Sequence, residues 1–167
     1  MKKVFQTIID RGNGNCMQAA IASLFELPLE KVPHFISLGK DWWQTYCDFL
    51  QEQGYAFEDY LYNYLYESMA QTQSDCFVAP MKAKWSISKK KLYKEHSVNG
   101  YFHASVLSPG NFSLKDADRG CHHSVIIDKD YNIVHDPNPK YQTVRQYPLA
   151  HLIKFNGVIC VDLYKKI

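Results

Sequence analysis

The chain has 167 residues, a length typical of one domain, and we expect a single domain over residues 1–167. A content of 46% hydrophobic and 14% aromatic residues excludes a disordered or fibrous chain and supplies material for a buried core. The formal net charge of +2 creates no strong field, so we expect neither nucleic acid nor a membrane as partner.

The N-terminal residues, the hydrophobic stretches and the cysteines favour a cytoplasmic protein. The N-terminal apolar run is short and ends at Asp10, which is not typical of a signal peptide, and no stretch has the length of a membrane span. The five cysteines are an odd number without close pairing, which does not indicate a disulfide framework. No Cys-x-x-Cys or His-x-x-x-His spacing occurs, so we expect no metal and no cofactor.

The N-terminal part is predicted to form a strand, a loop and a helix. Residues 3–9 are β-branched and aromatic, which favours a first strand, and residues 11–15 form a loop rich in Gly and Asn. From Cys16 the apolar residues recur at helical spacing, and Asn15 is a suitable N-cap. The residues of that apolar face are Met17, Ala20, Ile21, Leu24 and Phe25.

Further elements follow in chain order. Residues 28–32 predict one short helical turn, and a second helix is predicted over residues 41–53, capped by Asp41 and ended by Gly54. Tyrosines alternate within residues 55–75, but good helix formers lie among them, and we expect a helix there.

The rest of the chain is rich in strand-forming residues. Residues 111–120 predict a polar loop, and the lysines between residues 82 and 94 indicate a solvated loop or helix face. Strands are predicted at residues 76–81, 101–107, 123–127, 131–135 and 158–164, with the third and fourth as a hairpin. Helices followed by an antiparallel sheet indicate the α+β class.

Cys16 is the candidate nucleophile. It lies where the glycine-rich loop meets the start of a helix, and the positive end of the helix dipole favours the thiolate. Gly12 and Gly14 allow close approach of the backbone and expose N–H groups to an oxyanion. Cys47, Cys76 and Cys160 are expected to be packing residues.

A histidine and an acid follow Cys16 in the chain. His122 and His123 start a predicted strand, and either imidazole can act as general base for the thiol. Because neighbouring strand residues point to opposite faces, only one of them can face Cys16, and the alternation does not decide which. Asp136 ends the paired strand and can orient the imidazole, a role that Asn138 can also fill.

These motifs carry a resemblance to a known family. Residues 14–24 (GNCMQAAIASL), followed by His-Ser-Val-Ile from His123 and Val-His-Asp-Pro from residue 134, resemble the papain-like cysteine peptidases, above all the bacteriocin-processing branch. Val-Pro-His-Phe at 32–35 and the His-Asp-Pro-x-Pro ending are similar to those of small bacterial and phage proteins.

The resemblance implies a papain-like fold, with a helical N-terminal part that carries Cys16 on a helix N-terminus and packs on a C-terminal antiparallel sheet. It favours His123 over His122 as base and implies a Cys16-His123-Asp136 triad. Papain-like enzymes carry an oxyanion-hole Gln six positions before the cysteine, where this chain has Asp10. Gln6 is therefore our candidate for that role, with Asn13 and Asn15 as alternatives.

Three functions compete at this point. The first is thiol-dependent hydrolysis or acyl transfer on a peptide, isopeptide or amide bond, with a peptide or protein as substrate. The second is a non-catalytic binding module of a phage or mobile element, which a large separation between Cys16, His123 and Asp136 would favour. The third, a metal site formed by Cys121, a neighbouring histidine and His135, has no supporting spacing.

Overall fold

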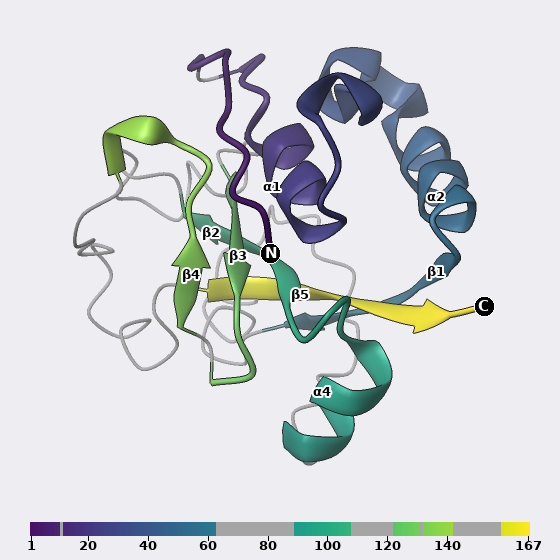
Figure 1. Cartoon of the computed structure of the whole chain (residues 1–167). Coiled ribbons are helices and arrows are strands. Elements are labelled where there is room, and N and C mark those ends of the chain that lie inside the picture. Colours follow the sequence, from purple (N-terminus) through teal and green to yellow (C-terminus); the bar gives the residue numbers. More distant parts are fainter. Residues whose placement is uncertain (11, 63–88, 108–121, 131, 142–157) are drawn as a thin grey trace, which may run out of the picture.

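The computed structural model describes residues 1–10, 12–62, 89–107, 122–130, 132–141 and 158–167 (Figure 1). Within these residues, the strands form one antiparallel sheet in the order β1-β5-β2-β3-β4, which confirms the α+β class. The strands are β1 (Tyr55–Tyr62), β2 (Phe102–Leu107), β3 (His122–Ile127), β4 (Ile133–His135) and β5 (Val158–Lys166). The described helices are α1 (Cys16–Leu24), α2 (Trp42–Glu52) and α4 (Lys89–His96), with 3₁₀ turns η1 (Leu29–Lys31), η2 (Phe35–Asp41) and η3 (Pro139–Tyr141).

α1 is the central helix. It packs on β3 and β2, while α2 packs on β1 and α4 on β5 (Figure 1). Nearly all of its side chains are buried, and the alanines let the helix approach the sheet closely. The core between the helices and the sheet includes Met17, Ala20, Ile21, Leu24, Phe35, Tyr46, Phe49, Leu50, Ile126 and Tyr164.

α1 ends in a turn that no glycine in the sequence indicates. The Leu27 N–H donates to the Ala22 carbonyl at 2.9 Å and the Glu26 N–H donates to the Ser23 carbonyl at 3.3 Å. This pair of bonds is the Schellman arrangement, which needs a left-handed residue at its centre. Glu26 fills that position at a φ of 59°, where glycine is the usual residue.

Most predicted elements are confirmed. These are the helices that start at Cys16 and after Asp41, the turn at η1, the strand at β2, the β3–β4 hairpin and the final strand. The predictions for residues 76–81 and 111–120, and those parts of 55–75 and 82–94 that lie within 63–88, fall outside the described residues. Residues 89–94 lie on α4, which agrees with a helix face in that stretch.

The strand predicted at residues 3–9 is wrong. Backbone groups of this segment bind side chains instead of a neighbouring strand: the Val4 N–H donates to Ser23 Oγ at 2.9 Å. The Val4 carbonyl accepts hydrogen bonds from Ser23 Oγ at 3.3 Å and from His135 Nε2 at 2.8 Å. The segment is thus an extended connection that runs beside α1 toward the loop before Cys16 (Figure 1).

The prediction of a helix from residue 55 is wrong for residues 55–62, which form strand β1. The alternating tyrosines indicate the strand better than the intervening helix formers indicate a helix, because pairing with β5 is a tertiary contact that overrides local propensity. The two predicted helix caps are also wrong in detail. Asn15 and Asp41 hold the N-cap positions of α1 and α2, but neither side chain makes a capping hydrogen bond.

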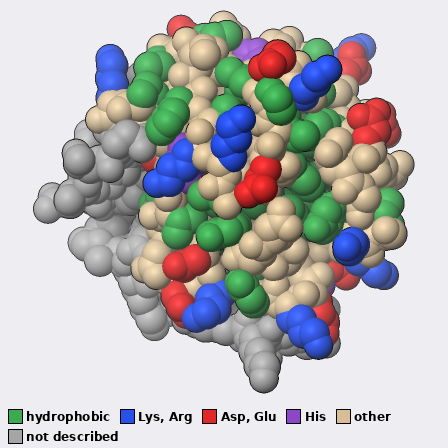
Figure 2. All heavy atoms as spheres, viewed as in Figure 1, with side chains coloured by type: hydrophobic (Ala, Val, Ile, Leu, Met, Phe, Trp, Pro, Cys, Tyr) green, Lys and Arg blue, Asp and Glu red, His purple; other side chains and the backbone are tan. Residues whose placement is uncertain are grey.

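The surface in Figure 2 mixes side chains of all kinds. Lys, Arg, Asp and Glu are interspersed over the described part of this face, and no side-chain charge of one sign dominates it. Large hydrophobic side chains also reach solvent on the segment that leads to α1, namely Phe5, Ile8 and Ile9.

Candidate active site

Asp10 holds the loop that leads into α1. Its Oδ1 accepts hydrogen bonds from the backbone N–H groups of Asn13 and Gly12, both at 2.8 Å. These two bonds lower the pKa of the Asp10 carboxyl because they favour its charged form. The two N–H groups are committed to Asp10, so the expectation that the Gly12 N–H is offered to an oxyanion is wrong.

Gly14 is required by the packing of the loop on itself. A Cβ atom at this position would lie 2.5 Å from the Asp10 carbonyl oxygen and 3.4 Å from the Ile8 carbonyl oxygen. Side chains do not fit into such a gap. The close approach therefore serves the chain itself and lets the Asn15 N–H reach the Ile8 carbonyl at 3.2 Å.

Asn15 ties the N-terminal segment to the start of α1. Its Oδ1 accepts hydrogen bonds from the backbone N–H groups of Thr7 at 3.0 Å and Ile8 at 2.9 Å. Its Nδ2 donates to Thr7 Oγ1 at 3.2 Å and to Gln18 Oε1 at 3.0 Å. The buried carboxamide is fully used in positioning the residue before Cys16, which argues against Asn15 as an oxyanion donor.

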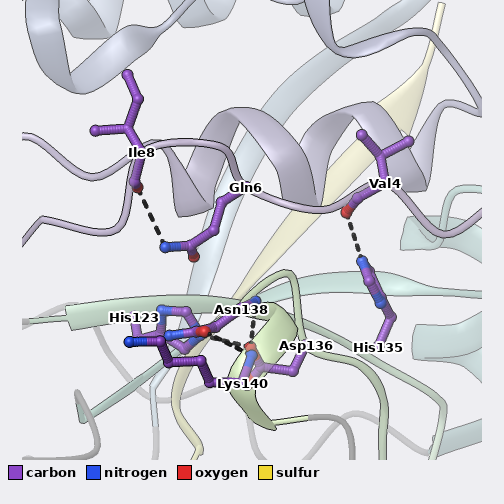
Figure 3. A network of polar contacts seen from close by, with 8 residues as sticks. All are labelled: Val4, Gln6, Ile8, His123, His135, Asp136, Asn138 and Lys140. Carbon is purple, nitrogen blue, oxygen red and sulfur yellow. Dashed lines mark hydrogen bonds and ion pairs between the residues drawn. The ribbon is translucent and has the colours of Figure 1, made fainter.

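His123 and Asp136 form a buried pair. Antiparallel pairing of β3 with β4 places Ile126 opposite His135, and this register brings the start of β3 near the residue that follows β4. His123 Nε2 donates to Asp136 Oδ1 at 2.8 Å (Figure 3). The Asn138 N–H donates to the same oxygen at 2.8 Å and holds the carboxylate in place.

Cys16 completes this arrangement. It is the first residue of α1 and partly exposed, and its thiol lies near enough to the His123 side chain and to Ser124 for both to lower its pKa. Because Asp136 occupies Nε2 of the imidazole, Nδ1 is the ring nitrogen left for the thiol. The imidazole of His123 therefore links the Asp136 carboxylate, to which it is hydrogen-bonded, with the Cys16 thiol at the start of α1.

The pKa values of Cys16 and His123 are shifted in opposite directions. Burial opposes the change, but hydrogen bonds from His123 and Ser124 lower the pKa of the Cys16 thiol. For His123 burial again opposes the change, while the hydrogen bonds to Asp136 and Cys16 raise its pKa from 6.5 to about 9. Both shifts favour a thiolate beside an imidazolium.

The other described cysteines have the opposite character. Burial raises the pKa of Cys47, with the Asp48 charge adding to the effect. Burial raises the pKa of Cys160 to about 12. Within the part of the chain that the structure describes, Cys16 is thus the one thiol whose pKa falls, and Cys76 and Cys121 lie outside that part.

The two histidine candidates separate in the structure. His123 is the one hydrogen-bonded to Asp136 and close enough to Cys16 to lower the pKa of its thiol, whereas the backbone of His122 pairs with Leu107 in the sheet and its side chain is not among the described ones. His135 is structural: its Nε2 holds the Val4 carbonyl, and burial lowers its pKa.

The remaining candidates take supporting positions. Asn138 Oδ1 accepts the Lys140 N–H at 3.0 Å, so its carboxamide shapes the turn after β4 while its backbone N–H braces Asp136. Asn13 is exposed on the loop, held through its backbone by Asp10. Gln6 is buried, and its N–H donates to the Pro137 carbonyl at 2.9 Å, which places it next to the Asp136 turn.

Two features of the interior escaped sequence reasoning. Ser124, the neighbour of His123, helps to lower the pKa of the Cys16 thiol, and no motif indicates this role. A second buried histidine–aspartate pair joins His103 Nδ1 and Asp162 Oδ2 at 2.7 Å. The same Oδ2 accepts a hydrogen bond from the Tyr46 hydroxyl at 2.8 Å.

This second cluster is structural packing beneath α2. Tyr164 joins it through its hydroxyl, 2.7 Å from that of Tyr46. Burial raises the pKa of both phenols well above the ordinary range, so they remain neutral donors. The members of this cluster come from α2, β2 and β5, so no local pattern in the sequence indicates that they meet.

Comparisons with protein-family models, curated proteins and solved structures gave no match for this chain. Across the described residues, no group of three or more His, Cys, Asp or Glu side chains is placed to hold a metal ion. None of the described helices has the length and apolar character needed to cross a bilayer. We therefore infer a function from the geometry around Cys16.

Proposed function

We propose that this protein is a thiol-dependent enzyme that hydrolyses, or transfers the acyl group of, a peptide, isopeptide or amide bond. One observation carries the proposal: the His123 imidazole is hydrogen-bonded to Asp136 and lies close enough to Cys16 for the two groups to shift each other's pKa. Nucleophilic cysteines need a base within hydrogen-bond reach and a third group that orients the base, and these three residues supply those parts.

The charge state of the pair supports nucleophilic attack. With the thiol pKa lowered and the imidazolium pKa raised to about 9, transfer of the thiol proton to His123 is favoured. The pair is active above the lowered pKa of Cys16, where the thiolate exists. Activity is lost again as the pH rises through about 9, where the imidazolium loses the proton that it must donate.

The proposed reaction has two steps, formation of a thioester on Cys16 and its cleavage. The Cys16 thiolate attacks the carbonyl carbon, and the electron pair of the C=O bond moves to oxygen. When the carbonyl re-forms, the C–N bond breaks and the His123 Nδ1 proton goes to the leaving amine, which leaves a thioester on Cys16. Water, or an acceptor amine, then attacks the thioester while His123 takes its proton, and the thiolate departs.

The N-terminus of α1 suits the negative charge of the tetrahedral intermediate. As the first residue of the helix, Cys16 has a backbone N–H without an intrahelical carbonyl partner. Its N–H points in the direction of the positive end of the helix dipole, which favours thiolate and oxyanion alike. We assign the Cys16 N–H as one oxyanion donor.

We also propose that the fold is papain-like. The nucleophile at the start of α1, the base on β3 and the acid after β4 follow the order that the resemblance implies. In support, α1 packs directly on β3 and β2, so the helix that carries Cys16 lies against the strands that carry the rest of the machinery.

The hydrogen-bonded geometry favours catalysis over the binding-module alternative. That alternative expects Cys16, His123 and Asp136 to lie too far apart for hydrogen bonds, whereas His123 meets both neighbours. A module that retains the fold only as a scaffold has no need to keep a buried imidazole between a carboxylate and a thiol, because burying polar groups is costly.

Turnover measurements test the proposal. A fluorogenic library of peptidyl-aminomethylcoumarins is offered to the wild-type protein and to the Cys16→Ala, His123→Ala and Cys47→Ala variants. We expect turnover by the wild type and by Cys47→Ala, and a loss of about 10³-fold or more in the other two. Equal turnover by Cys16→Ala and the wild type would contradict the proposal, as would its absence with every peptide of the library.

A further inference from the structure

Gln6 is fixed between the two segments that carry the proposed catalytic residues. Its backbone N–H donates to the Pro137 carbonyl at 2.9 Å, directly after Asp136. The next two residues, Thr7 and Ile8, donate their N–H groups to the carboxamide of Asn15, which precedes Cys16. Hydrogen bonds to both segments therefore fix the backbone from which the Gln6 side chain extends.

The carboxamide of Gln6 has a defined orientation. Its Nε2 donates to the Ile8 carbonyl at 3.2 Å, and because a carbonyl oxygen can only accept, the nitrogen must be the atom on that side. The oxygen Oε1 then points the other way. Figure 3 shows the side chain leaving the N-terminal segment toward His123 and Asn138, with its oxygen on their side.

This oxygen is a buried acceptor without a donor. Gln6 is only 7% exposed, and no hydrogen bond to Oε1 forms among the residues that the structure describes. The nearby donors on that side are committed, since His123 Nε2 and the Asn138 N–H both donate to Asp136 Oδ1. Leaving a buried acceptor unpaired costs free energy, so such groups call for a partner that the folded chain alone does not supply.

We propose that Gln6 Oε1 accepts a hydrogen bond from an N–H group of the bound substrate, which makes Gln6 a specificity-determining residue for amides and peptides over esters. This inference rests on the proposed function. It replaces the expected role of Gln6 as oxyanion donor, because an acceptor directed at the site would repel a developing oxyanion. Binding a substrate N–H pairs the buried oxygen, whereas an ester leaves it unpaired.

Two small alkylating reagents test the acceptor directly. Iodoacetamide and methyl iodoacetate share the iodoacetyl group and a carbonyl, but only iodoacetamide carries N–H donors. The ratio of their alkylation rates at one cysteine cancels intrinsic thiol reactivity and any donor that binds the carbonyl. In the wild type we expect this ratio to be about fivefold or more higher at Cys16 than at Cys47, from the strength of one neutral hydrogen bond.

Two variants locate the effect. Gln6→Met removes the acceptor at similar length, and we expect the ratio at Cys16 to fall to that of Cys47. Gln6→Glu keeps an acceptor and removes the Nε2 donor, and we expect the ratio to stay high. Peptide mapping by mass spectrometry reads both cysteines in one sample, and circular dichroism checks the fold of each variant.

Equal ratios at Cys16 and Cys47 in the wild type would overturn the inference, and this comparison needs no variant. A ratio that falls equally in Gln6→Glu and Gln6→Met would also overturn it, because the donor would then carry the effect. Failure of the proposed function is a separate result: it appears as slow alkylation of Cys16 by both reagents, whatever their ratio.

Discussion

Replacing Asp136 with asparagine removes one charge from the site and keeps the shape of the side chain. The Oδ1 of asparagine still accepts hydrogen bonds from His123 Nε2 and from the Asn138 N–H, which in the wild type are both 2.8 Å from the carboxylate. The variant therefore isolates the electrostatic contribution of Asp136 to the state of His123 and, through it, of Cys16.

The magnitude follows from the pKa of His123. Burial lowers this pKa, but the bonds to Asp136 and Cys16 more than offset it and raise the value from 6.5 to about 9. That rise corresponds to about 3 kcal/mol in favour of the imidazolium. If the charge of Asp136 supplies half, Asp136→Asn costs about 1.5 kcal/mol and lowers the population of the thiolate–imidazolium pair roughly tenfold where it is only partly formed.

The assay is the rate of Cys16 alkylation by iodoacetamide as a function of pH. Neutralising Asp136 makes the imidazolium less stable, so at a pH between the two pKa values less of the proton that the pair shares lies on His123 and less of Cys16 is thiolate. We expect the alkylation rate in that range to fall by up to about tenfold in Asp136→Asn. The control is Asp130→Asn, which removes the same charge from the exposed β3–β4 turn. A rate that falls no further in Asp136→Asn than in Asp130→Asn would refute the assignment of Asp136.

Two further predictions concern the framework. Gly14→Ala places a Cβ atom 2.5 Å from the Asp10 carbonyl oxygen, whereas the Cβ of Gly12→Ala meets nothing closer than 3.8 Å. In urea titrations we expect Gly14→Ala to lower the free energy of unfolding by about 1–3 kcal/mol. Gly12→Ala is the control, and we expect it to lower that free energy by well under 1 kcal/mol. Tyr46→Phe removes a hydroxyl shared by Asp162 and Tyr164, and we expect about 1–2 kcal/mol of destabilisation with unchanged iodoacetamide reactivity of Cys16. Comparable unfolding midpoints for the two glycine variants, or altered Cys16 reactivity in Tyr46→Phe, would contradict these expectations.

Elements with a strong local pattern were predictable from the sequence. The helical spacing after Cys16 and the short turn between two β-branched runs correspond to α1 and to the β3–β4 hairpin. The hairpin pattern also predicts that Asp136 lies near His123, because it brings the start of one strand to the end of the other. In each case the signal lies in residues close together in the chain, where periodicity and turn chemistry are informative.

The wrong predictions concern segments whose structure is determined by contacts with residues far away in the chain. Residues 3–9 have the composition of a strand, but Ser23 and His135 take the Val4 backbone groups that a neighbouring strand would need. β1 forms because β5, a hundred residues away, pairs with it. The orientation of the Gln6 carboxamide depends on a single carbonyl, that of Ile8, and no spacing rule reaches that level of detail.

We propose that Cys16 and His123 form a thiolate–imidazolium pair, and the reactivity of the Cys16 thiol reports on that pair. The rate of iodoacetamide alkylation at pH 6.5 is compared for Cys16 and Cys47 in the wild type and in His123→Ala. We predict that Cys16 reacts at least about tenfold faster than Cys47 in the wild type and loses that advantage in His123→Ala. Equal rates for the two cysteines in the wild type, or an unchanged Cys16 rate in His123→Ala, would contradict the account.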